Sequence, residues 1–305
     1  MLEMNTRNKG TRGGDSKKRT FKGKKKEEKA TSRTGNPVVK KEVKAKDKAR
    51  FSDYKERLKT GDPLPTFSDS VRLNKYLSNA GVCSRRDADV LIKTGVVTVN
   101  GVVITEMGFK VSPTDEIKYD GGSIKAEKKR YVLLNKPKGF ITTMDDPQGR
   151  KTVMSLVKSA CKERVYPVGR LDKETTGLLL FTNDGDMAKK LTHPKHKASK
   201  IYHVTLDKKV AKDDLGKLTA GIKLEDGTTI FDKAEFVNDS SSRDIGVELH
   251  SGKNRIVRRS FEAMGYKVQK LDRVTFSGLT KRDLPRGMFR LLSEKEVAFL
   301  KMKKE

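Results

Sequence analysis

One short segment of the chain combines an acidic residue with neighbours that could hold it in a tight loop. The segment reads VGRLDKETTGLLLFTNDGD, with Asp172 between Gly169 and Gly177, and with Thr175 and Thr176 following it. Glycine permits a sharp backbone, and threonine hydroxyls can hydrogen-bond a loop. A carboxylate presented in this way is suited to act as a general base or a nucleophile. An aspartate in a turn is more often a simple turn former, so the segment alone is weak.

The other residue types that commonly carry chemistry do not form a recognisable site. The histidines and cysteines lack the spacing of a zinc site; they are His193, His196, His203, His250, Cys83 and Cys161. No glycine pattern typical of phosphate or dinucleotide binding is present. We therefore expect no metal and no organic cofactor. The HPKH stretch around His193 and His196 is better interpreted as an RNA-facing loop, and the cysteines are expected to stay reduced in the cytoplasm.

Alternating strand and helix patterns follow one another through the region that must position Asp172. Asp172 is predicted to lie on a turn between a strand ending near Val168 and a fully apolar strand at Leu178–Thr182, which is typical of burial on both faces. An α+β domain with a mixed, largely antiparallel sheet is the expected result over residues 130–305. The other predicted strands are 131–134, 201–206, 234–237, 245–250 and 270–276, and the predicted helices are 152–162, 186–191, 213–220, 254–264 and one from Ser293.

Residues 71–126 have the pattern of a small independent domain made of two helices and short strands. The first helix ends at Gly81, Ser84 begins the second with Asp87 three residues later, and Asn100-Gly101 predicts a hairpin turn. Basic side chains are expected to project from the two helices and contact phosphates (Arg72, Lys75, Arg85 and Arg86). A solvated helix face is the alternative interpretation of the paired arginines.

Charge is the strongest compositional signal. The chain has 68 Lys and Arg against 40 Asp and Glu, a net charge of +28, and residues 1–50 alone hold 18 Lys and Arg against 6 acidic residues. A polyanionic partner is the natural expectation. We predict a disordered basic extension over residues 1–65, which is either a solubilising tail or an RNA-contacting arm. The sequence has no apolar run long enough to span a membrane, and its first residues do not have the pattern of a signal peptide. We therefore expect no membrane association.

Two stretches resemble known families. The segment RLNKYLSNAGVCSRRDADVLIKTGVVTVNG closely resembles the RNA-binding domain named after the fourth small-subunit ribosomal protein. The Asp172 segment, NKPKG, KIYHV, GKNRIVRRSFEAMGY and GMFRLLSEKE resemble, in that order, the pseudouridine synthases of the RsuA/RluB group. This resemblance covers residues 71–300. It implies that Asp172 is the catalytic aspartate, Tyr202 the active-site tyrosine and Arg258 the basic partner. One departure is Ile256, where many relatives have Gln or Glu.

The resemblance implies an enzyme that isomerises a uridine of ribosomal RNA without a cofactor. Asp172 would either attack the anomeric carbon or remove the neighbouring ribose proton, and Arg258 is expected to form a bidentate ion pair with it. Tyr202 would offer its ring face to the uracil. Arg170, Arg255 and Arg259 are further candidates for RNA contact. Arg170 could equally be a surface arginine, and Arg255 and Arg259 could meet acidic neighbours.

Large-subunit rRNA, free or in an assembly intermediate, is the preferred substrate, and small-subunit rRNA is the runner-up. A non-catalytic rRNA-binding assembly protein and a DNA-binding protein that uses only the basic extension are the alternatives. A pure RNA binder has no need of a carboxylate facing phosphates, which argues against the first of these. A cytoplasmic monomer is our default expectation.

Overall fold

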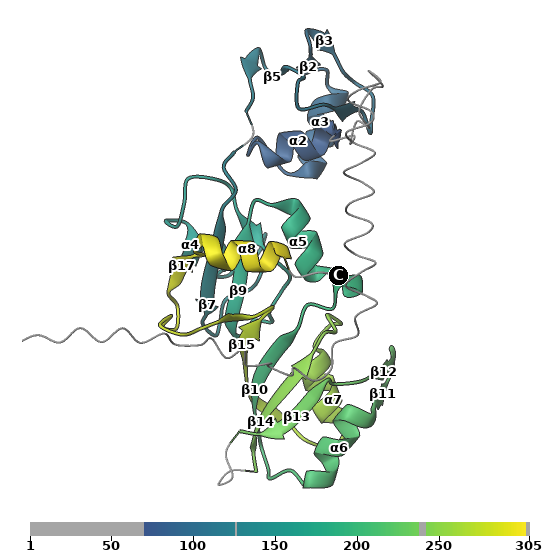
Figure 1. Cartoon of the computed structure of the whole chain (residues 1–305), viewed down its shortest axis with the longest axis vertical. Coiled ribbons are helices and arrows are strands. Elements are labelled where there is room, and N and C mark those ends of the chain that lie inside the picture. Colours follow the sequence, from purple (N-terminus) through teal and green to yellow (C-terminus); the bar gives the residue numbers. More distant parts are fainter. Residues whose placement is uncertain (1–69, 126, 238–241, 303–305) are drawn as a thin grey trace, which may run out of the picture. The chain divides into compact units, whose positions relative to one another are not determined.

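A computed structural model describes residues 70–125, 127–237 and 242–302 of the chain. The predicted basic extension over residues 1–65 lies outside these ranges. The structure described comprises a small N-terminal part, residues 70–125, and a larger part that contains the Asp172 segment (Figure 1). The domain boundaries expected from the sequence remain a prediction.

The small part has two helices over short strands, as predicted. Helices α2 (Leu73–Asn79) and α3 (Arg85–Lys93) pack around an apolar cluster that includes Leu77 and Ile92. Ser84 and Asp87 form a complete capping box at the start of α3, with both reciprocal hydrogen bonds present. The strands form two small sheets, β1 (Val71–Arg72) with β4 (Lys110–Val111), and β3-β2-β5-β6 (Val102–Val103, Val97–Val99, Ile117–Tyr119, Gly122–Ser123).

The predicted hairpin at Asn100-Gly101 is confirmed. Asn100 and Gly101 both have positive φ, 51° and 81°, and they connect β2 to β3. Two successive left-handed residues are the requirement of the tight turn that asparagine and glycine favour, because its twist matches that of the strands. The turn therefore follows directly from the two residue types.

A mixed, mostly antiparallel sheet forms the centre of the larger part, as predicted. Its strands run in the order β13-β14-β10-β15-β9-β7-β17, with β8 and β16 attached to β9 and β15. Among the strands that the structure describes, only β9 and β15 pair in parallel within this sheet. The strand bounds are β7 Tyr131–Lys136, β8 Tyr166–Pro167, β9 Thr176–Thr182, β10 Lys200–Leu206, β13 Lys233–Phe236, β14 Asp244–Leu249, β15 Val268–Phe276, β16 Leu279–Thr280 and β17 Phe289–Leu291.

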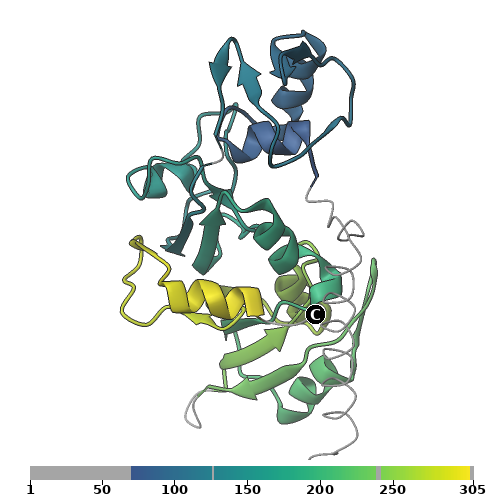
Figure 2. The same ribbon diagram turned by 45° about the horizontal axis from the view of Figure 1, so that its top comes forward.

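Helices cover both faces of this sheet, which explains the continuous apolar run in β9. Leu178 and Leu180 pack into one apolar cluster, with residues of α5 (Gly185–Thr192) and α8 (Glu294–Met302). Leu179 and Phe181 pack into the other, with residues of α4 (Met154–Val157), α6 (Lys212–Ala220) and α7 (Ile256–Ala263). In Figure 1, α8 crosses the strands β7 and β9, and Figure 2 shows the same helix, in yellow, from a second direction. The centre of the sheet is thus a rigid, dry support for the loops at its edge.

Two predicted elements differ from the structure in extent. The helix expected over residues 152–162 is reduced to the single turn of α4, because Thr152 bridges to Ile141 and the first turn bonds residues three apart rather than four. The HPKH stretch forms a short 3-10 helix, η1 (Pro194–His196), begun by the His193 ring, whose Nδ1 accepts from the Lys195 backbone N–H. A hairpin of β11 (Ile222–Leu224) and β12 (Gly227–Thr229) was not predicted.

Candidate active site

Asp172 lies in the loop that leads into β9, a central strand of the sheet, and it lines two hollows in the surface. The first is a cavity of about 400 Å³, lined by Asp172, Tyr202 and Arg255 together with residues of β10 and β15. The second is lined by residues between Ile141 and Arg150 and shares Asp172, Arg170 and Arg255 with the first. Both have the volume of ordinary ligand pockets.

A buried lysine holds the backbone of the Asp172 loop. Lys136, at the end of β7, is fully buried, and its ammonium donates to the backbone carbonyls of Asp172 (3.0 Å), Lys173 (3.3 Å) and Thr175 (2.8 Å), and also to that of Pro137 (3.2 Å). Burial lowers the pKa of Lys136 to about 8, although the neighbouring Asp172 carboxylate opposes the shift. The prediction missed Lys136 as a functional residue. The sequence feature that could have indicated Lys136 is its position between the end of an apolar strand and a proline.

A second clamp comes from Thr142. Its hydroxyl donates to the Leu171 carbonyl (2.7 Å) and accepts from the Leu171 N–H (3.2 Å), so it holds the residue before Asp172 on both sides. We expected Thr175 and Thr176 to do this, and that expectation is wrong for their hydroxyls. The Thr175 hydroxyl has no partner among the described residues, and the Thr176 hydroxyl bonds the Leu271 carbonyl and Asp272 on β15. Thr175 contributes through its backbone N–H, which donates to the Asp172 carbonyl.

Tyr202 lies on β10 with only 9% of its surface exposed, and it serves the core and the cavity at once. It belongs to the apolar cluster under α7, and it also lines the cavity that contains Asp172. Core packing therefore fixes the ring at the wall of the cavity. The structural interpretation of a strand tyrosine is confirmed, and the active-site role of Tyr202 stays a prediction.

Arg258 lies behind the cavity rather than in an ion pair with Asp172. It is 8% exposed on α7, and its Nη1 donates to the Val268 carbonyl at 3.0 Å, while its Nε is buried without a partner. Within the part of the chain that the structure describes, Asp172 and Arg258 do not approach to ion-pair distance, so the expected bidentate pair is not formed. Burial and the nearby Arg255 lower the pKa of Arg258, and the Asp172 carboxylate opposes that shift.

The other predicted arginines divide into two kinds. Arg170 and Arg255 are exposed and line both hollows, and Arg255 holds a strained left-handed backbone (φ 47°) just before α7. Arg259, in contrast, is half-buried and pairs with Asp226 (2.9 Å) between β11 and β12, and Arg255 also has an acidic neighbour, Glu262, at 3.6 Å. Ile256, the departure from the family pattern, is buried and forms part of the cavity wall, where it adds apolar surface.

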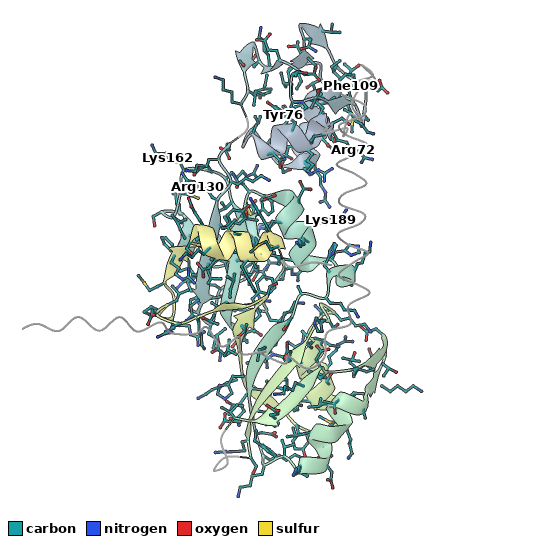
Figure 3. The ribbon with its side chains drawn as sticks, in the orientation of Figure 1. Arg72, Tyr76, Phe109, Arg130, Lys162 and Lys189 are labelled. Carbon is teal, nitrogen blue, oxygen red and sulfur yellow. The ribbon has the colours of Figure 1, made fainter. Side chains whose placement is uncertain are left out.

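The basic residues predicted on the small part lie on or next to its two helices. Arg72, Arg85 and Arg86 are exposed, and Lys75 lies on α2 (Figure 3 labels Arg72). Arg85 and Arg86 are the first two residues of α3, directly after the Ser84 cap, where backbone N–H groups also favour anions.

No group of three or more metal-binding side chains occurs within residues 70–302 as far as the structure describes them. In the same residues, no helix has the length and apolar character that crossing a bilayer requires.

Comparison with known proteins agrees with this arrangement. The family model described as RNA pseudouridylate synthase matches residues 130–263, and the S4 domain model matches residues 71–117. The chain is 44% identical to ribosomal large subunit pseudouridine synthase B of Bacillus subtilis, over 75% of this chain and 95% of that protein. It is 41% identical to an uncharacterized RNA pseudouridine synthase of Aquifex aeolicus, over 75% and 93% of the two chains.

A solved structure has the same fold. A crystal structure of a pseudouridylate synthase is 29% identical and superposes with a TM-score of 0.55, covering 76% of this chain and all of that one. The matched families and the relatives agree on one assignment. The chain belongs to the RsuA/RluB family of RNA pseudouridine synthases, with an N-terminal S4 domain.

Proposed function

We propose that the protein converts a specific uridine of large-subunit ribosomal RNA to pseudouridine and that Asp172 is the carboxylate that acts on the reacting nucleotide. The observation that carries this proposal is the placement of Asp172. Its backbone is fixed by Lys136 and Thr142, while its carboxylate has no hydrogen bond or ion pair within the described residues and lines two hollows. A carboxylate that is held but unpaired is available to a substrate.

The reaction moves one bond of the nucleoside. The bond between ribose C1′ and uracil N1 breaks, its electron pair stays on the ring, and C5 then bonds to C1′. The C5 hydrogen leaves as a proton, and N1 takes one up, so nothing is oxidised and no group is lost. Asp172 would either attack C1′ or remove the neighbouring ribose proton, and both roles require the carboxylate to be ionised.

Tyr202 and Arg258 have distinct places in this scheme. Tyr202 would present its ring to the uracil after the nucleotide leaves its stack, because it lines the cavity from a rigid strand. Arg258 does not pair with Asp172 in the free enzyme, and as a buried cation on α7 it would add positive charge to the surroundings of the carboxylate.

RNA would be held mainly by charge. Arg170 and Arg255 flank Asp172 in both hollows, and the S4 domain exposes Arg72, Arg85 and Arg86. Phosphate contacts of this kind give affinity without choosing a sequence. The large-subunit target is supported by the Bacillus subtilis relative, whose name assigns it to that subunit. A cytoplasmic monomer remains part of the proposal.

The test is to map pseudouridine in both ribosomal RNAs from cells that lack the gene. Each strain would carry wild type, Asp172→Asn, or Glu174→Gln as a matched control. Glu174 is an exposed carboxylate in the same loop, paired with Lys138 at 2.9 Å. We expect one large-subunit position to lose its pseudouridine, and wild type and Glu174→Gln to restore it, but not Asp172→Asn. Loss at a small-subunit position would correct the target, and no loss anywhere would favour the assembly-protein alternative.

A further inference from the structure

The cavity that Asp172 lines also contains a buried cation with no role in the proposed reaction so far. Arg273, on β15, is 3% exposed and lines the same cavity as Asp172 and Tyr202. Its Nε donates to the Leu178 carbonyl (2.7 Å), and its guanidinium lies over the Phe276 ring, 4.6 Å from the centroid. Its Nη2 is buried and has no hydrogen-bond partner. Within the described residues, no carboxylate pairs with it.

An irregularity in the sheet brings Arg273 into the cavity. Tyr202 lies opposite Arg273, and Lys200 lies opposite Phe276. The two pairs are therefore two positions apart on β10 but three positions apart on β15. The register skips Val274, which is a β-bulge. In a regular strand, Arg273 and Phe276 would point to opposite faces. The bulge turns both toward the cavity and re-aims a side chain, as bulges near functional sites often do.

The strand on the other side fixes the backbone of Arg273. Gly177 of β9 pairs in parallel with Arg273, and a Cβ on Gly177 would lie 2.3 Å from the Arg273 carbonyl oxygen and 2.5 Å from its nitrogen. Such close contact leaves little freedom to the backbone of Arg273. The neighbouring cation, Lys200, is already satisfied by the carbonyls of Ala198 (3.0 Å) and His250 (2.8 Å), so it does not compete with Arg273 for a ligand.

A buried guanidinium is always charged, and a free N–H without a partner costs stability. The unpaired Nη2 of Arg273 belongs to a residue that lines the same cavity as Asp172, so a ligand in the cavity could accept its hydrogen bond. The detached uracil supplies such a ligand. When the C1′–N1 bond breaks, its electron pair moves onto N1 and is shared with the carbonyl oxygens O2 and O4, which become strong acceptors.

We propose that Arg273 stabilises the uracil anion by donating from Nη2 to one of its carbonyl oxygens. The inference rests on the proposed function and deepens it. Arg273 gains its partner only as charge develops on the ring, so it lowers the barrier to bond breaking more than it strengthens RNA binding. It serves both possible roles of Asp172, because the uracil leaves with the bonding pair in either case. The anion is also held for recapture, as C5 must next bond to C1′.

The test compares Arg273→Met and Arg273→Lys with wild type in single-turnover reactions on an rRNA fragment with enzyme in excess. Two substrates would be used, one with uridine and one with 5-fluorouridine at the target. Fluorine withdraws electrons and stabilises the ring anion without help from the protein. Consumption of the starting nucleoside would be followed by chromatography after digestion, and RNA dissociation constants and melting temperatures would be measured alongside.

With uridine, we expect Arg273→Met to slow the reaction by about 10²-fold, while the RNA dissociation constant changes less than about threefold. Arg273→Lys should recover part of the rate, because it restores a cation. With 5-fluorouridine the deficit of both variants should shrink by about tenfold, in proportion to the more stable anion. A merely structural arginine would give equal losses on both substrates.

Equal losses on both substrates, or no loss, would overturn this inference while leaving the isomerase intact. If Arg273→Met does not fold, the substrate dependence of Arg273→Lys decides the question alone. Wild type that binds the fragment but consumes neither substrate would remove the proposed function, and this inference with it. Asp172→Asn, which should be inactive on both substrates, sets the baseline.

Discussion

Two segments meet at the candidate active site, and they are held in different ways. The Asp172 loop has its carbonyls tied to buried donors, Lys136 and Thr142, while its carboxylate stays free. The segment before α7 is anchored at its two ends, by Lys200 at the His250 carbonyl and by Arg259 at the Asn254 carbonyl, and leaves Arg255 exposed. One side of the site is preorganised for chemistry. The other presents cations to a ligand that brings its own negative charge.

The difference teaches where precision is needed. A reacting carboxylate must be placed within fractions of an ångström, so its loop is fixed by buried hydrogen bonds to a rigid sheet. Phosphate contacts tolerate wider variation, because Coulomb attraction falls off slowly with distance. Substitutions in the support of the Asp172 loop should therefore affect turnover, and substitutions in the arginine segment should affect RNA affinity and its salt dependence.

The largest effect is expected where the two central strands of the site touch. Gly177→Ala places a Cβ 2.3 Å from the Arg273 carbonyl oxygen at a φ of +106°. We expect a loss of about 4 kcal/mol in the free energy of unfolding, from overpacking and left-handed strain together. Gly139→Ala is the matched control, because Gly139 has a φ of +91° but nothing within 4 Å of the new Cβ. It should lose about 1–2 kcal/mol. Equal losses in urea unfolding would mean that the close strand contact is unimportant.

Removing the buried lysine should sharpen the contrast between the two segments. Lys136→Met leaves the carbonyls of Asp172, Lys173 and Thr175 without their donor, so we expect about 3 kcal/mol of destabilisation and a fall in kcat of at least about tenfold. RNA affinity should stay within about threefold, since the arginines are untouched. Lys138→Met is the control, because Lys138 forms only an exposed ion pair with Glu174. It should change neither the free energy of unfolding nor kcat measurably. A loss of affinity without a loss of kcat would break the comparison.

Acid should weaken the support of this sheet edge through Asp272. Burial opposes its ionisation, but hydrogen bonds from Arg286, Lys281 and Thr176 outweigh this and lower its pKa to about 2. The folded pKa is below the unfolded value, so Asp272 contributes stability above about pH 4 that is lost as the pH falls toward 2. The contribution is about 2 kcal/mol. Asp272→Asn should flatten the decline in unfolding free energy between pH 4 and 2, whereas Asp283→Asn, at an exposed residue, should leave it unchanged.

The smallest expected effect concerns the second clamp. Thr142→Val keeps the shape of the side chain but loses both hydrogen bonds to Leu171, so kcat should fall about tenfold, with a stability loss of about 1 kcal/mol. Thr143→Val is the control, because the Thr143 hydroxyl bonds only the exposed Asp145 carbonyl. The measurement is single-turnover pseudouridine formation. Equal rates for Thr142→Val and wild type would show that Lys136 suffices to hold the loop.

Local patterns predicted much of the fold because they express local physics. The apolar run in β9, the Asn100-Gly101 turn and the Ser84 cap each follow from periodicity or turn chemistry over a few residues. The helix over residues 152–162 was overestimated, because the bridge from Thr152 to Ile141 is a tertiary contact that helical spacing does not reveal.

The site was only partly predictable, for the same reason. Asp172, Tyr202 and Arg255 do line one cavity. Lys136 and Arg273 lie 36 residues before and 101 residues after Asp172, and only the strand pairing brings them to it. A buried lysine or arginine cannot be told from an exposed one by residue type. The missing ion pair between Asp172 and Arg258 likewise depends on where α7 directs its side chains, which is a matter of packing.

The central claim is that Asp172 carries out the isomerisation while its loop neighbours only place it. The most direct test is tritium release from rRNA labelled at uracil C5, prepared from cells lacking the gene, in single-turnover reactions with wild type, Asp172→Asn and Glu174→Gln. We predict release by wild type and Glu174→Gln, and a rate at least about 10³-fold lower for Asp172→Asn, with RNA binding retained. Release by Asp172→Asn at the wild-type rate would contradict the account.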